Sequence, residues 1–317
     1  MTYSSGGSIQ ASDFNALAGG NPTSTANTLN VTWATGNGNA GYGQTALANV
    51  SVGGVVSASG QWGTLVANIA NAALHQGSSI SSTVAPVTGG SIAFQNAINT
   101  NLATVYTNRL NASAQSTTVA NTVTTVSTWS QIATWTHTIT FASGDAARYF
   151  FNSGGQLKVT CSHPSGTGIN LLLNNLASNI GTVVMSSPIS GTVTIAGTTY
   201  NGITKVGGGG NSPTVSTNTG YYALTTTNTS VFTQTASTGP AYYISTSINV
   251  TVKSNGTQGS NGDKGSVITI YTVWDEIPNG LVVASGSTTT VTAQLPETTY
   301  IGNSWGSITV AGSVAVV

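Results

Sequence analysis

Apolar side chains in the first third of the chain recur with the spacing of a helix. Phe14 and Leu17, together with Ala11 and Ala18, share one helical face before Gly19-Gly20 supplies a stop. Two more stripes have the same spacing: Trp62, Leu65, Val66, Ile69 and Ala73, then Phe94, Ala97, Ile98, Leu102, Val105 and Tyr106. This pattern predicts a small module of three helices over residues 1–115.

Beyond Asn111 the apolar positions recur with a period of two, which is typical of strands with one buried face. Between Ile132 and Phe141 one face carries Ala133, Trp135, His137, Ile139 and Phe141, and the other carries Thr134, Thr136, Thr138 and Thr140. Further strands are predicted at Ala146–Asn152, Gln156–Ser162, Thr192–Thr198, Tyr221–Thr226, Ser230–Ala236, Tyr242–Lys253, Ser266–Trp274 and Ser307–Val314.

Only Gly168 to Ile180 interrupts the strands with helical spacing, so one short helix is expected there. The predicted fold class is therefore mainly β. A small N-terminal helical module is followed by an antiparallel β-sandwich or jelly-roll-like domain over residues 116–317.

The connection between the strands at Tyr242–Lys253 and Ser266–Trp274 consists almost wholly of turn-forming residues. A polar hairpin tip of this length can serve as a contact loop, and a solvated loop without a partner is the alternative. The residues predicted to make contacts are Asn255, Gly256, Thr257, Gln258, Asn261, Asp263 and Lys264.

Charge is scarce: 4% of the 317 residues are Asp, Glu, Lys or Arg, against about 25% in an ordinary soluble domain. Six acidic and six basic groups cancel, so no long-range field attracts nucleic acid or an anionic membrane. No run approaches the roughly 18 apolar residues of a membrane-spanning helix. A neutral surface of Ser, Thr, Asn and Gly tolerates close packing against copies of itself.

Few residues have the chemistry that catalysis requires. Asp275 and Glu276 are neighbours at a strand end and point to opposite faces, which is poor geometry for cleaving a glycosidic bond. Asp145 and Arg148, three residues apart, are interpreted as an ion pair that stabilises a turn. We therefore predict no enzymatic activity and no cofactor.

The histidines and the single cysteine have structural interpretations. His75 falls at a predicted helix end, where a cationic ring can meet free carbonyl groups, and His137 is expected to be a neutral, hydrogen-bonded core residue. Cys161 and His163 supply two metal ligands where a structural zinc site needs four. Cys161 shares a strand face with Leu157 and Val159, which indicates a buried, unreactive thiol.

Aromatic pairs offer a possible contact with carbohydrate. Tyr221-Tyr222 and Tyr242-Tyr243 would each place one ring on either face of a strand, where rings stack on sugars. Packing in the core or between subunits is the favoured interpretation.

Several local sequences resemble virion structural proteins of tailed bacteriophages, in particular tail-fibre or baseplate-associated proteins of cyanophages. The N-terminal part carries the resemblance at residues 7–15 (GSIQASDFN), 41–44 (GYGQ), 75–77 (HQG) and 108–110 (NRL), and the β part at residues 147–155 (ARYFFNSGG). The resemblance implies a non-catalytic part of the particle, with a helical module for docking or oligomerisation and a β domain that projects outward.

The resulting hypothesis is a non-enzymatic tail component, in the fibre, the baseplate or an adaptor, that assembles in the host cytoplasm and resides in the virion. Expected partners are copies of itself, with a trimer favoured, other virion proteins, and a host surface glycan or envelope protein. Nucleic acid and membrane insertion are not expected. The alternatives are a capsid decoration or cement protein and, less favoured, a tail enzyme that cleaves host polysaccharide.

Overall fold

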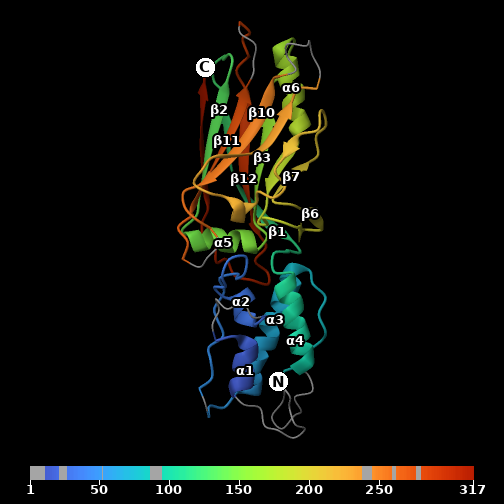
Figure 1. The fold of residues 1–317 in the computed structure, drawn as a ribbon, viewed down its shortest axis with the longest axis vertical. Coiled ribbons are helices and arrows are strands. Elements are labelled where there is room, and N and C mark those ends of the chain that lie inside the picture. Colours follow the sequence, from blue (N-terminus) through green and yellow to red (C-terminus); the bar gives the residue numbers. More distant parts are fainter. Residues whose placement is uncertain are drawn as a thin grey trace.

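A computed structural model describes residues 11–20, 27–51, 53–85, 95–237, 245–258, 262–275 and 280–317. The molecule is elongated, with the N-terminal helices at one end and the strands at the other (Figure 1). The fold is mainly β, with antiparallel sheets after the N-terminal helices, as the alternation of apolar residues predicted.

All three predicted N-terminal helices are present, although Phe94 lies outside the described residues. They are α1 (Ala11–Ala18), α3 (Gly63–Gln76), which a π-helical turn at Ala58–Trp62 precedes, and α4 (Gln95–Thr107). A short helix that the pattern did not predict, α2 (Leu29–Trp33), lies between the first two in sequence. Gly77 ends α3 in a left-handed conformation (φ 68°), which only glycine adopts freely.

Two antiparallel sheets face each other in the β domain. The first has the order β1 (Gln115–Thr124), β12 (Thr288–Pro296), β3 (Gln156–Ser162), β4 (Thr182–Met185) and β7 (Ile203–Val206). The second has the order β13 (Thr309–Val316), β2 (Ala133–Thr140), β11 (Val267–Asp275), β10 (Ser247–Ser254), β9 (Thr229–Thr235) and β8 (Thr214–Val215).

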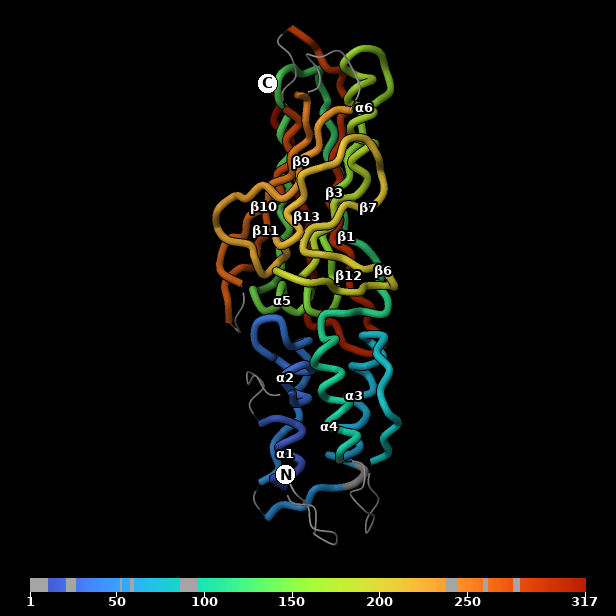
Figure 2. Tube along the Cα trace, turned by 45° about the vertical axis from the view of Figure 1, so that its right-hand side comes forward, coloured from blue at the N-terminus to red at the C-terminus, as the bar shows by residue number. Residues whose placement is uncertain are grey.

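Burial alternates along the central strands because one face of each sheet is turned to the other sheet. In β2, Ala133, Trp135, His137 and Ile139 are buried and the four threonines lie on the outside, as predicted. Helix α6 (Ile169–Ile180) is the predicted short helix and lies along the β domain (Figure 2). Its Leu172, Leu173 and Leu176 belong to the same core, and the helix contacts β3, β9 and β10. One continuous apolar core includes residues of both the helical part and the β part.

The strand predicted at Ala146–Asn152 is wrong, because this segment belongs to helix α5 (Gly144–Asn152). The hydroxyl of Ser143 accepts a hydrogen bond from the N–H of Ala146 at 3.0 Å and caps the helix, and Asp145 lies in its first turn. The described residues of the β domain therefore form two α-helices, where the sequence predicted one.

Two other strand predictions need correction. Tyr221–Thr226 is not a strand, because Tyr221–Ala223 forms a 3-10 turn. Thr192–Thr198 is not one strand, since the chain reverses between β5 (Val193–Ile195) and β6 (Thr198–Tyr200). The two residues at this turn, Ala196 (φ 49°) and Gly197 (φ 77°), both have positive φ, as a tight hairpin requires.

Candidate functional site

Helix α5 lies across the end of the β domain that faces the helical module (Figure 1). The loop at residues 34–44 of the helical module is packed against it. A Cβ on Gly43 would lie 2.5 Å from the ring of Tyr149, so only glycine permits this close approach. We call the contacts between this loop, α5 and the ends of α3 and α4 the junction cluster.

Arg148 is the charged centre of the junction cluster and is fully buried. Its guanidinium group donates to the carbonyl oxygens of Thr35 at 2.8 Å, Ala40 at 2.9 Å and Gly38 at 3.2 Å. It also pairs with the carboxylate of Asp145 at 3.0 Å. The predicted ion pair is confirmed, but it lies in the first turn of a helix and connects two parts of the molecule.

Other residues that are far apart in the sequence meet in the same cluster. The Tyr42 hydroxyl donates to the carbonyl of Arg109 at 2.9 Å and accepts from the side-chain amide of Gln76 at 2.7 Å. Asn152 donates to the carbonyl of Gly41 at 3.1 Å. The sequences at residues 41–44, 75–77, 108–110 and 147–155, which are far apart in the chain, therefore form one contact region.

The interpretation of His75 as a cationic cap is wrong. Its side chain is buried against the ring of Tyr42, with the ring centroids 5.2 Å apart, and Gly77 provides the end of the helix. Burial lowers the pKa of His75 to about 4, although a hydrogen bond with the backbone of Ser153 and the charge of Glu297 oppose this shift. The imidazole is therefore neutral at neutral pH.

The core position predicted for His137 is confirmed, since its ring lies fully buried between the two sheets. The predicted hydrogen bond is not formed, because neither ring nitrogen has a partner in hydrogen-bonding geometry among the described residues. Burial lowers the pKa of His137 to about 4, opposed by the nearby backbone of Asn121. The ring is therefore neutral at neutral pH, as expected.

The predicted contact loop lies at the junction end of the β domain. Asn255, Gly256, Thr257, Gln258, Asp263 and Lys264 are described, and Asn261 lies outside the described residues. The N–H of Gly262 donates to the carboxylate of Asp145 at 3.1 Å, so the loop is attached to α5. Asn255, Thr257 and Lys264 remain exposed. Their role as contact residues stays a prediction.

The outer face of the six-stranded sheet is rich in hydroxyl and amide groups. The row of threonines on β2 lies beside Thr269 and Tyr271 of β11, and β10 adds Asn249 and Lys253. The Lys253 ammonium lies 5.6 Å from the centre of the Tyr271 ring. Such a face can bind neutral, hydroxyl-bearing ligands or a neighbouring protein surface.

Tyr221 and Tyr222 pack inside the molecule, the interpretation that the sequence favoured over carbohydrate contact. Tyr221 is buried and stacks on Phe151 with ring centroids 4.3 Å apart, while the Tyr222 hydroxyl lies 2.7 Å from the carbonyl of Gly38. Both rings therefore serve core packing and the junction cluster. Tyr242-Tyr243 lies outside the described residues.

A buried polar network at the far end of the β domain escaped the sequence analysis. The Nδ1 atom of His163 lies 2.8 Å from the Ser287 hydroxyl, and Nε2 lies 3.1 Å from Oδ1 of Asn170. This order of groups matches a nucleophile, a base and an orienting amide. However, Ser287 is fully buried and accepts from the indole N–H of Trp129 at 3.2 Å, so we assign it a structural role.

Cys161 has the properties of the unreactive thiol that was predicted. Burial raises the pKa of Cys161 to about 12, and its sulfur lies 3.8 Å from the Thr289 hydroxyl. Across the described ranges, no three His, Cys, Asp or Glu side chains come close enough together to hold a metal ion. Asp275 ends β11, and Glu276 is outside the described part.

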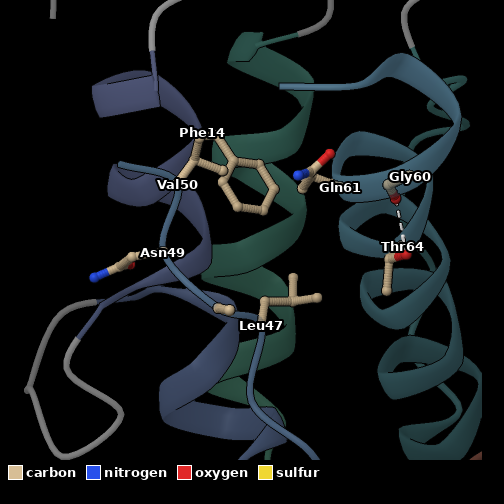
Figure 3. Close-up of a pocket in the computed structure, with 8 residues that line it drawn as sticks. Phe14, Leu47, Asn49, Val50, Gly60, Gln61 and Thr64 are labelled. Atoms are coloured by element: carbon tan, nitrogen blue, oxygen red, sulfur yellow. Dashed lines mark hydrogen bonds between the residues drawn. The ribbon is translucent and has the colours of Figure 1, made fainter. Parts of the chain in front are cut away.

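A shallow pocket of about 430 Å³ opens in the helical module (Figure 3). Phe14, Leu47 and Gln61 line it, and the Thr64 hydroxyl is already bonded to the carbonyl of Gly60 at 2.8 Å. None of its lining side chains is ionisable, so the pocket offers no acid, base or charged anchor for a ligand.

No helix in the part that the structure describes is long and apolar enough to cross a membrane. No family model, curated protein or solved structure matches this chain.

Proposed function

We propose that this protein is a non-enzymatic structural component of a tailed-phage virion, located in the tail as part of a fibre, the baseplate or an adaptor. The observation that carries the proposal is the near absence of charge on a long, β-rich molecule. A chain with 4% charged residues interacts through shape, hydroxyl groups and amides, which suits permanent assembly. The proposed partners are copies of itself, other virion proteins and a host surface glycan or envelope protein.

The arrangement of the two parts supports this role. The helical module lies at one end of the long axis, and the exposed Val126, Val282 and Val317 lie in segments at the other end of the β domain. Hydrogen bonds join these segments, for example from the N–H of Ser130 to the carbonyl of Val317 at 2.7 Å. The helical module would dock on the particle, and the β domain would project from it.

Immunogold labelling of intact particles tests the location. The expected result is label on the tail, including its fibres and baseplate. Label on the head would replace this proposal with the decoration or cement protein, and purified particles that lack the chain by mass spectrometry would overturn both. New reducing ends after incubation with host surface glycans would contradict the non-enzymatic assignment.

A further inference from the structure

The outer strands of the two sheets lie along one flank of the β domain. Strand β13 is the last strand of the six-stranded sheet, and β1 is the last strand of the five-stranded sheet. They contact each other there, because a Cβ on Gly312 would come within 2.7 Å of the side-chain oxygen of Asn121. Two long strand edges are therefore exposed side by side.

The hydrogen-bonding groups on the free side of β13 follow from its pairing with β2. Val317 donates its N–H to the carbonyl of Ile132 at 3.1 Å, and the register with β2 has no shift. Backbone groups alternate sides along a strand, so every second residue directs its N–H and C=O away from β2. These residues are Val310, Gly312, Val314 and Val316.

The same alternation applies to β1. Thr125 donates to the carbonyl of Ser287 at 2.9 Å, so the groups that point away from β12 belong to Thr118, Ala120, Thr122 and Thr124. Among the described residues, no hydrogen bond reaches the backbone of either free side. Both edges therefore present rows of unused donors and acceptors.

These edges lack most of the features that prevent sheets from joining. Natural edge strands are protected by charge, proline, bulges or short length. Neither β13 nor β1 contains a charged residue or a proline. The register of β13 has no shift over its eight residues, and that of β1 shifts only at its start, between Gln115 and Thr118. The outer strands on the opposite side, β7 and β8, have only four and two residues.

We propose that this flank joins copies of the chain, with β13 of one copy pairing with β1 of the next. The proposal rests on the self-assembling role given above. Both strands run away from the helical module, since Gln115 follows α4 and Thr309 pairs with Thr140, close to α5. Copies that keep their helical modules at one end would bring β13 and β1 together in parallel around a common axis.

If the copies keep their helical modules at one end, the strand directions exclude antiparallel pairing of β13 with β13. Antiparallel pairing of β13 with β13 would place the helical modules at opposite ends of a dimer. A closed ring needs two different edges on each copy, and this flank supplies them. Because neither edge is charged, copies approach without repulsion, and backbone hydrogen bonds provide the recognition.

Introducing lysines on β13 tests whether this flank forms the contact between copies. The variant Ala311→Lys/Ser313→Lys changes two exposed side chains of β13, and Thr194→Lys/Thr199→Lys places the same charges on the exposed β5–β6 hairpin as a control. By sedimentation velocity, we expect the wild-type chain and the control to be oligomers and the β13 variant to fall to the monomer mass. Circular dichroism confirms that each variant is folded.

Crosslinking tests which strands meet. Copies carrying Cys161→Ser and Ala120→Cys are co-expressed with copies carrying Cys161→Ser and Ser313→Cys and treated with a short bismaleimide, so that the half-buried native thiol cannot contribute. We expect covalent products from the mixture and none from either variant alone. Products from Ser313→Cys alone would overturn the pairing with β1.

The outcomes separate the two proposals. An oligomer that survives the β13 lysines overturns only this inference, because self-assembly itself is then intact. A wild-type chain that stays monomeric at every concentration overturns this inference and the self-assembly on which it rests.

Discussion

The helical module and the β domain differ in how the N–H and C=O groups of their extended segments find hydrogen-bond partners. In the β domain, strands bond to neighbouring strands. In the helical module, asparagine side chains replace the missing strand: Asn30 donates to the carbonyl of Leu47 at 2.9 Å and accepts from the N–H of the same residue at 2.8 Å. Asn15 bonds in the same two-way manner to Val50, and Asn101 to Ser81.

This difference explains how a chain with so few charges fixes its loops. A side-chain amide has a donor and an acceptor and can therefore pair with a peptide group as another peptide would. The same device reaches across the junction, where Gln44 pairs with Gly302 in both directions at 2.8 Å. The helical module should therefore be sensitive to single polar side chains, whereas the β domain spreads its bonds over many residues.

The largest effect is expected where the two regions meet. In Arg148→Met, the carbonyl groups of Thr35 and Ala40 lose their partner. The carbonyl of Gly38 and the carboxylate of Asp145 lose the guanidinium group and keep only weaker, neutral donors. We expect a loss of about 3–5 kcal/mol in the free energy of unfolding, because breaking a buried ion pair leaves unpaired groups. Urea denaturation followed by circular dichroism measures it.

Arg109→Met is the matched control for this variant. Arg109 is half-buried and also contacts the loop, donating to the carbonyl of Tyr106 at 2.7 Å and to two oxygens of Asn39 at 2.8 Å. The bonds to Asn39 are exposed to water, so the loss of Arg109 should cost about 1 kcal/mol. Equal effects of the two substitutions would show that the buried Arg148 contributes no more to the junction than the partly exposed Arg109.

Acid should lower the stability of both regions, because each contains a buried neutral histidine. The folded-state pKa of about 4 for His75 and for His137 lies below the ordinary histidine value of 6.5, so the unfolded chain binds more protons between these values. Stability is fully present above about pH 6.5 and falls as the pH approaches 4. At 1.36 kcal/mol per pKa unit, each histidine accounts for up to about 3 kcal/mol.

Urea denaturation at pH 7 and pH 4.5 measures this loss, and NMR titration of the two rings measures the pKa values separately. Equal stability at the two pH values, or ring pKa values near 6.5, would contradict it.

A smaller effect is expected inside the helical module. In Asn30→Leu, the N–H of Leu47 and the carbonyl groups of Leu47 and Gly19 lose their partner in a buried site, which should cost about 2 kcal/mol. Thermal melting measures it. Asn96→Leu, at an exposed position of α4, is the control and should change stability little. Similar values for both variants would refute the role of the amide pairs.

Sequence periodicity predicted much of this fold and little of its junction. The alternation in β2 and the spacing in α6 are strong because each element has one buried face. Helix α5 was missed because the aromatic run at residues 149–151 has strand propensity, and its buried face depends on contacts with distant loops. Strands β1 and β12 are rich in threonine on both faces and give no clear alternation.

For the candidate sites, too, the sequence predicted what depends on local structure and missed what depends on distant segments. The unreactive character of Cys161 and the neutrality of His137 follow from the strand faces on which they lie. The role of Arg148 depends on carbonyl groups more than 100 residues away, which no local spacing reveals. The pairing of asparagines with loops is also invisible in sequence, because Asn is abundant throughout the chain.

The smallest effect is expected from the hydroxyl pairs on the outside of the β domain. The hydroxyl groups of Thr122 and Thr290 lie 2.8 Å apart on neighbouring strands and are exposed to water. Thr122→Val keeps the β-branched shape and removes only this bond, for which water competes, so we expect a change within about 0.5 kcal/mol by urea denaturation. A loss above about 1.5 kcal/mol would mean that the β domain also depends on single polar pairs, and the contrast with Asn30 would fail.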